Sequence, residues 1–184
     1  ELGVDRILGT SAVGSLNPKI HVGELIALEQ LVDFSKHRRE TFNLGSANLT
    51  NPYCSETRKA IIAQSSAEGI PLHEQATYIS FEGPRYETAA EIHLFQKWGM
   101  DVVGMTNGTE AALARELGIC YAVIAIATNM AAGLSSVEPD LATHRQVMQE
   151  NSLKLRTLAL ATVLALPDEH GCDCASLAAV PVHE

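Results

Sequence analysis

The chain has 184 residues, 46% of them hydrophobic, and a formal net charge of -9. We therefore expect one globular domain over residues 1–184, and we exclude a nucleic-acid groove because the largest basic cluster is His37–Arg39. No apolar run approaches the roughly 20 residues that span a bilayer, which predicts no membrane partner and a cytoplasmic protein.

The first part of the chain predicts two strands and a long loop. Val4–Gly9 has the apolar character of a buried strand, and the small residues of Thr10–Ser15 predict a turn. Exposed backbone amides in that turn can hold an anion, and a plain strand-to-loop turn is the alternative. Gly23–Val32 predicts a second strand, and the polar segment Asp33–Tyr53 predicts a loop that serves as a lid or a subunit contact.

A first corner between a strand and a helix is predicted in the middle of the chain. Residues 55–69 predict a helix, and Ala76–Phe81 predicts the strand that follows. A Gly-Pro pair ends this strand, and residues 88–91 have the capping-box pattern that begins the next helix. Tyr86 and Glu87 therefore lie at this corner.

A second corner follows directly. Asp101–Met105 predicts a short strand, and Asn107 with Glu110 three residues later predicts the cap of another helix. Met105 and Thr106 therefore lie at the second corner.

The last strand and helix complete the expected fold. Tyr121–Thr128 is an almost unbroken apolar run, which predicts a strand buried on both faces, and Asn129 is expected to end it. Glu138–Leu166 has helical spacing and ends before a proline. The order of strands and helices predicts the α/β class with a largely parallel or mixed sheet.

The cysteines do not form the framework of a secreted disulfide protein. Cys54 and Cys120 lie in separate apolar stretches, and we expect reduced thiols. The C-terminal tail, residues 168–184, carries four further groups that could bind a metal: His170, Cys172, Cys174 and His183. These are too few well-placed ligands for a zinc site, so we expect no metal and a packed or flexible tail.

The two corners and the end of the last strand bring together side chains that suit a purine nucleoside and an anion. Tyr86 can stack on a base or ribose, Met105 can line the sugar, and Glu87 and Asn129 can recognise the edge of the base. Each has a simpler alternative. Tyr86 and Met105 can pack in the core, Glu87 can favour a helix N-terminus, and Asn129 can terminate a strand.

Several segments resemble the trimeric family of purine nucleoside phosphorylases and methylthioadenosine phosphorylases. The segments are Gly83–Thr88, Gly104–Glu110, Thr128–Asn129, Ser11–Leu16 and Asn51–Cys54, and the resemblance covers nearly the whole chain. Residues 111–118 and 129–133 look most like its S-methyl-5'-thioinosine phosphorylase branch. The resemblance implies a mixed, partly barrel-like twisted sheet flanked by helices, and a homotrimer in purine salvage.

The implied reaction is attack of phosphate on the anomeric carbon of a purine nucleoside, which releases the base and ribose 1-phosphate or its 5-methylthio analogue. Phosphate is a co-substrate, and no metal or organic cofactor is implied. The resemblance assigns Asn129 to catalysis, Glu87 to N1-H of the base, Tyr86 and Met105 to base and sugar packing, Thr106 to sugar or phosphate, and the Ala12 backbone to phosphate.

Two positions bear on the substrate. Adenine-specific relatives have aspartates where this chain has Asn129 and Ala131, so we expect a 6-oxopurine such as methylthioinosine or inosine. His144 lies in a stretch similar to that where ordinary purine nucleoside phosphorylases place a histidine against the 5'-hydroxyl, which favours inosine or guanosine. A solvated helix residue is the alternative for His144.

The chain also departs from the family pattern. It begins at Glu1 rather than Met, and the Gly-rich phosphate loop and Arg-His-Gly segment are absent, so we expect an N-terminally incomplete domain. Ser46 stands where methylthio-nucleoside relatives tend to have a histidine. The alternatives are therefore a methylthioadenosine phosphorylase, a truncated non-catalytic fragment that binds purine, and a nucleosidase that uses water.

Overall fold

Two long strands form the centre of a seven-stranded sheet in the computed structural model, which describes residues 2–38 and 41–181. The sheet order is β3-β5-β6-β1-β7-β2-β4. The strands are β1 (Arg6–Ser15), β2 (Leu25–Ala27), β3 (Gln30–Asp33), β4 (Leu72–His73), β5 (Thr77–Ser80), β6 (Val102–Gly104) and β7 (Cys120–Met130). Strands β1 and β7 run parallel, whereas β6 and β2 pair antiparallel to them, so the sheet is mixed.

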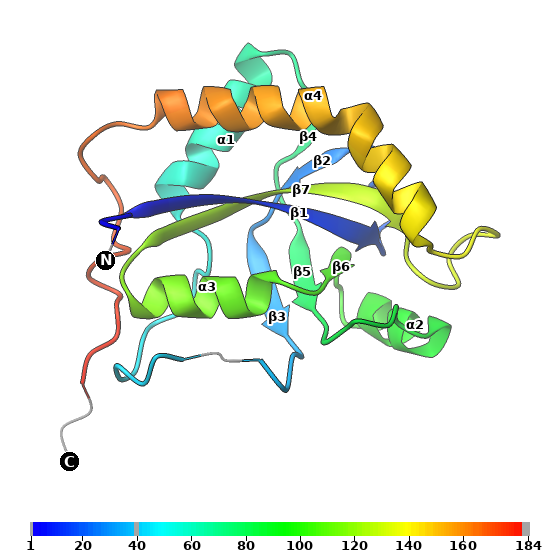
Figure 1. Ribbon diagram of the computed structural model, residues 1–184, viewed down its shortest axis with the longest axis horizontal. Coiled ribbons are helices and arrows are strands. Elements are labelled where there is room, and N and C mark those ends of the chain that lie inside the picture. The colour runs from blue at the N-terminus through cyan, green and yellow to red at the C-terminus, as the bar shows by residue number, and fades with distance from the viewer. Residues whose placement is uncertain (1, 39–40, 182–184) are drawn as a thin grey trace.

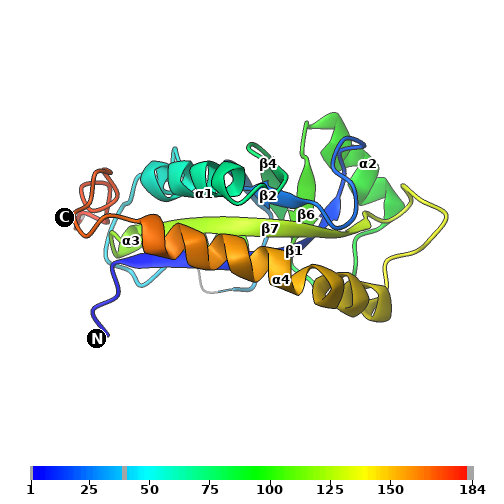
Figure 2. The same cartoon turned by 90° about the horizontal axis from the view of Figure 1, so that it is seen from above.

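Four helices flank this sheet: α1 (Ser55–Ala67), α2 (Ala89–Lys97), α3 (Asn107–Glu116) and α4 (Leu141–Ala165). Helices α1 and α4 lie together over one face, and α3 lies under the other (Figure 1). Figure 2 shows α1 and α4 on either side of β7 when seen from above. The predicted α/β class with a mixed, twisted and partly barrel-like sheet flanked by helices is confirmed.

Strand β7 is buried on both faces, as its apolar run predicts. Tyr121 and Val123 face the α3 side and pack in a core that contains Ala111, whereas Ile124 and Ile126 face α1 and α4. Burying each large apolar side chain contributes about 1.5–3 kcal/mol, so the apolar residues on both faces stabilise β7 in the interior of the sheet.

Three predictions about the strands are wrong in their limits. The segment Thr10–Ser15 is no turn, because β1 continues through it beside the small residues of β7. Gly23–Val32 divides into β2 and β3, which pair in different parts of the sheet. Asn129 does not end β7, which runs to Met130, and the two-residue strand β4 was not expected.

The two predicted helix caps differ in outcome. The Thr88 hydroxyl accepts a hydrogen bond from Glu91 N at 3.2 Å, and the Glu91 carboxylate accepts one from Thr88 N at 2.7 Å, so the capping box of α2 is confirmed. The predicted cap of α3 is wrong, because Asn107 is the first helical residue and Glu110 accepts a hydrogen bond from the Tyr121 hydroxyl. A buried hydroxyl needs a partner, and burial raises the pKa of Tyr121, which keeps it a donor.

The polar segment after β3 is a loop in its described residues, apart from one isolated bridge between Ser46 and Val180. The tail follows α4 and packs against this loop and the start of β7, which agrees with the packed alternative for residues 168–181. Arg39 and His183 lie outside the described residues.

Across residues 2–38 and 41–181, no helix is both long and apolar enough to cross a bilayer.

Candidate functional site

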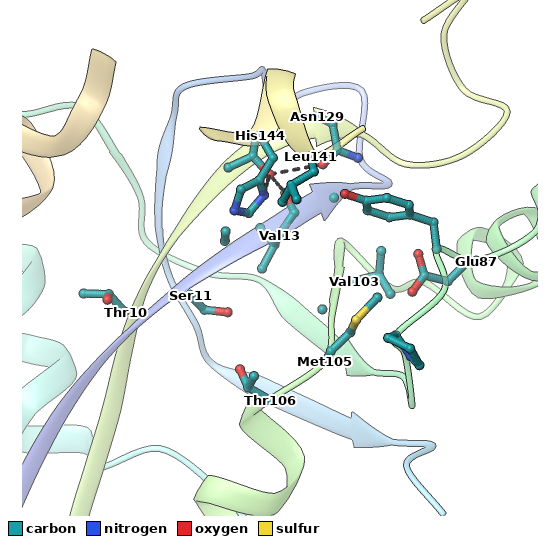
Figure 3. A pocket seen from close by; sticks show the side chains of 16 residues that line it. Thr10, Ser11, Val13, Glu87, Val103, Met105, Thr106, Asn129, Leu141 and His144 are labelled. Carbon is teal, nitrogen blue, oxygen red and sulfur yellow. Dashed lines mark hydrogen bonds between the residues drawn. The ribbon is translucent and has the colours of Figure 1, made fainter. Parts of the chain in front are cut away.

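A cavity of about 480 Å³ opens where β1, β6 and β7 end and α4 begins. Its lining comes from five separate segments of the chain (Figure 3). The lining residues are Thr10, Ser11, Ala12, Val13, Gly14, Pro84, Tyr86, Glu87, Val103, Gly104, Met105, Thr106, Thr128, Asn129, Leu141 and His144. This volume lies within the range of about 300–1,000 Å³ that is typical of small-molecule sites.

Seven of the eight site residues proposed from the sequence line this one cavity. Those at the cavity wall are Ala12, Tyr86, Glu87, Met105, Thr106, Asn129 and His144. Ala131 differs, because its side chain is buried in a core cluster with Leu16 and Ile92. Strand β7 ends at Met130, so Ala131 does not follow Asn129 on the same strand face.

A β-bulge in β7 sets the position of Asn129. Val13 pairs with Ala127 but Gly14 pairs with Asn129, so Thr128 is an extra residue in the β7 side of the ladder. A bulge re-aims the side chains that follow it. A Cβ atom on Gly14 would lie 3.2 Å from Asn129 Nδ2, so the glycine leaves the space that the carboxamide occupies.

Hydrogen bonds fix the orientation of the Asn129 carboxamide. Its Nδ2 donates to Met130 O at 2.9 Å, and its Oδ1 accepts from the Thr128 hydroxyl at 3.1 Å. The same hydroxyl lies 3.3 Å from His144 Nδ1 (Figure 3). Since a hydroxyl has one proton, a Thr128 that donates to Asn129 requires His144 to donate from Nδ1. The second Nδ2 proton of Asn129 remains available to a ligand.

Glu87 lines the cavity and has one buried carboxylate oxygen without a partner in the described part of the chain. The residue is only 8% exposed, and Oε1 has no hydrogen-bond partner among the described residues. Burial raises the pKa of Glu87, and the nearby Glu91 carboxylate adds to this effect. Arg85 does not pair with it, because its guanidinium binds Glu91 through two bonds of 2.9 and 2.8 Å. A ligand N-H would satisfy the free oxygen.

The aromatic ring and the thioether lie on the same side of the cavity as Glu87. Tyr86 is 41% exposed, so the core-packing alternative does not describe it. Met105 is half-buried and packs against Gly83, where a Cβ would clash with the Met105 sulfur. Gly83 also has φ 64°, so both the backbone and the space favour glycine there.

Hydroxyl groups and backbone line the other side of the cavity. Thr10, Ser11 and Thr106 surround this side together with the Ala12 segment of β1 (Figure 3). None of the described residues that line the cavity is lysine or arginine. An anion bound here would therefore meet hydroxyl and amide donors but no fixed positive charge of the described chain.

Sequence reasoning missed Thr128 and Leu141 as lining residues. Thr128 is the bulge residue, and a bulge has no reliable signal in a strand of small and apolar residues. Leu141 is the first residue of α4, 56% exposed, and it meets the cavity only because the helix starts beside the end of β7. A leucine at a helix start carries no sign of such a role.

Comparisons with known proteins agree on one family. Residues 1–164 match the family model described as the phosphorylase superfamily. The chain is 44% identical to the 6-oxopurine nucleoside phosphorylase of Pyrococcus furiosus, over 95% of this chain and 70% of that protein. It is 38% identical to the S-methyl-5'-thioadenosine phosphorylase of Pyrococcus abyssi, over 96% and 70%. The structure of a methylthioadenosine phosphorylase from Schistosoma mansoni with adenine has a TM-score of 0.88 and 25% identity, covering 92% of this chain and 68% of that one.

Proposed function

The chain belongs to the phosphorylase superfamily, and on that premise we propose that its cavity holds a 6-oxopurine nucleoside whose glycosidic bond is cleaved by phosphate. A phosphate oxygen bonds to the anomeric carbon while the bond from that carbon to the purine breaks. The electron pair of the broken bond leaves with the base. The observation that carries the proposal is that the Asn129 carboxamide and the unpaired Glu87 carboxylate line one cavity.

Asn129 acts on the departing base in this proposal. The purine gains negative charge as the bond to the sugar breaks, and N-H donors near N7 and O6 stabilise that charge more in the transition state than in the bound substrate. The Nδ2 proton that Met130 O does not take can make this contact. The bonds from Thr128 and to Met130 hold the amide in place before the reaction.

Glu87 selects the same base from its other edge. A 6-oxopurine carries a proton on N1, which a carboxylate accepts, whereas adenine has a bare lone pair there that would oppose the carboxylate. An unpaired buried polar group costs about 1–3 kcal/mol, so Glu87 and Asn129 both favour hypoxanthine or guanine over adenine. Relatives named 6-oxopurine nucleoside phosphorylase at 44% and 45% identity support this preference over those named S-methyl-5'-thioadenosine phosphorylase at 37% and 38%.

The phosphate and the 5' end of the sugar occupy the remaining wall. Phosphate would meet the hydroxyl of Thr106 and the β1 backbone at Ala12, which line the side of the cavity without a fixed positive charge. His144 and Leu141 extend from α4 toward the sugar end. A histidine suits a 5'-hydroxyl and a leucine suits a 5'-methylthio group, so inosine and methylthioinosine are the two candidate nucleosides.

We further propose a homotrimeric enzyme of purine salvage in the cytoplasm whose reaction needs no organic cofactor. Support for oligomerisation comes from apolar side chains that α4 exposes at Leu153, Leu160 and Leu164, which are 75%, 51% and 85% exposed. Four cysteines without a disulfide suit a reducing compartment. A monomer mass by light scattering, or recovery of the protein outside the cytoplasm, would contradict these assignments.

The test is phosphate-dependent release of hypoxanthine from inosine and from methylthioinosine, with adenosine as the comparison. We expect release from a 6-oxopurine nucleoside that requires phosphate, and at least about tenfold lower kcat/KM with adenosine. Release that continues without phosphate would indicate a nucleosidase. Absence of turnover together with normal hypoxanthine binding would indicate a non-catalytic purine-binding chain.

A variant of His144 distinguishes the two nucleosides in the same assay. With His144→Ala we expect kcat/KM to fall by about tenfold with inosine and by less with methylthioinosine, because only the former has a hydroxyl for the imidazole to bind. Equal losses with both substrates would assign His144 to the orientation of Thr128 and Asn129 instead. The matched control is His93→Ala, an exposed histidine on α2.

A further inference from the structure

Four cysteines from three separate parts of the chain meet at one point. Cys54 lies at the N-cap of α1, Cys120 begins β7, and Cys172 and Cys174 belong to the tail. Their four sulfur atoms all lie within 4.8 Å of one another. They are all the cysteines of the chain, and each is free.

The cluster is distinct from the cavity described above. Cys120 and Asn129 lie near opposite ends of β7, and the nine residue steps between them correspond to about 30 Å of strand. None of the four cysteines lines the cavity. Cys54, Cys120 and Cys174 are at most 4% exposed, so the cluster is enclosed by the fold rather than open to a substrate.

We propose that these four thiolates bind one structural zinc ion. A tetrahedral zinc site has Zn–S bonds of about 2.3 Å, which places the sulfur atoms about 3.8 Å apart. The sulfurs of Cys120 and Cys172 are 3.3 Å apart, and no two of the four sulfurs are more than 4.8 Å apart. The sulfur–sulfur distance of a zinc site lies between these two values. A closed shell of four thiolates with no open position is the donor set of structural zinc sites.

His170 and two carboxylates lie beside the cluster. His170 Nδ1 lies 3.4 Å from the Cys120 sulfur, and its Nε2 lies 2.9 Å from Asp5 Oδ2. An N-H at His170 Nδ1 can donate to the Cys120 thiolate, while Nε2 faces the Asp5 carboxylate. The Glu56 carboxylate lies within 4.8 Å of the Cys172 sulfur and the His170 ring, and it is paired with Arg6 at 3.3 Å.

The metal would hold the tail against the loop after β3. The described part of the tail, residues 168–181, has no helix or strand of its own, yet its backbone bonds to the loop and to the end of α3. Asn48 N donates to Leu177 O at 3.2 Å, and Ala179 N donates to Glu116 O at 3.1 Å. Zinc at Cys172 and Cys174 would fix the tail immediately before these bonds.

We expected no metal from the sequence because we considered only the ligands within the tail. Cys172 and Cys174 supply only two thiols, but folding adds Cys54 from the start of α1 and Cys120 from the start of β7. These come from positions 118 and 52 residues before Cys172, taking the difference of the residue numbers. Ligands so far apart show no motif spacing in the sequence.

The test is elemental analysis of the purified chain after purification under reducing conditions without chelator. We expect about one zinc per chain, and replacement by Co²⁺ should give the intense visible absorption of a tetrahedral thiolate complex. A zinc-selective chelator should lower the Tm, and added Zn²⁺ should restore it. A chain that binds no zinc even when reduced and supplied with Zn²⁺, or one whose mass shows two disulfides, would overturn the proposal.

Variants assign the ligands. We expect Cys174→Ser and Cys172→Ser each to reduce bound zinc by about tenfold or more, because thiolate is the softer ligand. The matched control is Asp173→Asn, an exposed change between the two cysteines, which should keep full zinc content. Equal zinc content in all three variants would overturn the assignment. If a variant does not fold, the change in Tm of the unaltered chain on chelation tests the proposal instead. These readouts do not depend on the proposed catalytic activity.

Discussion

The Asn129→Asp variant should lose about 100-fold in kcat/KM for phosphorolysis of inosine. The carboxylate cannot donate to N7 or O6 and repels the charge that the leaving base acquires, and 100-fold corresponds to about 2.7 kcal/mol of transition-state stabilisation. The change replaces one NH₂ group by one oxygen of similar size, so the packing around Gly14 is retained while the bond to Met130 O is lost. The measurement is hypoxanthine release at saturating phosphate.

Gln149→Glu is the matched control for this variant. It makes the same amide-to-carboxylate change at an exposed position on α4, away from the cavity lining, and should leave kcat/KM unchanged. Asn129→Asp with inosine activity within about threefold of the unaltered chain would remove Asn129 from the catalytic role.

The Glu87→Gln variant should lower activity and raise stability at the same time. We expect kcat/KM for inosine to fall by about tenfold or more, since a neutral amide accepts the N1 proton more weakly than a carboxylate. The free energy of unfolding at neutral pH should rise by about 1–3 kcal/mol, because a buried charge without a partner is removed. Thermal unfolding and the release assay together measure both effects.

The pH dependence follows from the raised pKa of Glu87. The folded protein holds this proton more tightly than the unfolded chain, so the contribution of Glu87 to stability is greatest below the ordinary glutamate pKa. This contribution is lost as the pH rises through the raised value. Activity moves in the opposite direction, because the proposed contact to N1-H requires the carboxylate and fails as Glu87 becomes protonated.

An exposed glutamate is the matched control for Glu87→Gln. The measurement is the affinity for hypoxanthine as a function of pH. Glu150→Gln on α4 should leave this pH profile unchanged and should change the free energy of unfolding by no more than about 0.5 kcal/mol. A Glu87→Gln chain that is less stable than the unaltered one at neutral pH would mean that the carboxylate has a structural partner, and the account of the site would be wrong.

The corners that carry Glu87, Met105 and Asn129 could be located from the sequence because short-range signals define them. The Gly-Pro pair, the capping box at Thr88 and the apolar run before Asn129 each mark the end of an element. These ends meet because of the order of the strands in the sheet, which local sequence patterns do not reveal. The expectation that they form one site came from the resemblance to a family.

Other parts of the site depend on tertiary structure alone. The small residues of Thr10–Ser15 favour a turn locally, but β7 pairs with the whole segment and β6 pairs with Gly14 and Ser15, which holds it as a strand. The bulge at Thr128 arises from the same pairing. The cysteine cluster likewise forms only when α1, β7 and the tail come together, so no local pattern could reveal it.

The recognition of a 6-oxopurine by Asn129 and Glu87 is tested most directly by the equilibrium binding of hypoxanthine and adenine to the chain. Calorimetric titration measures this without requiring phosphate or turnover. We expect hypoxanthine to bind at least about tenfold more tightly than adenine, which is a difference of about 1.4 kcal/mol. Equal affinities, or tighter binding of adenine, would contradict the assignment of both residues.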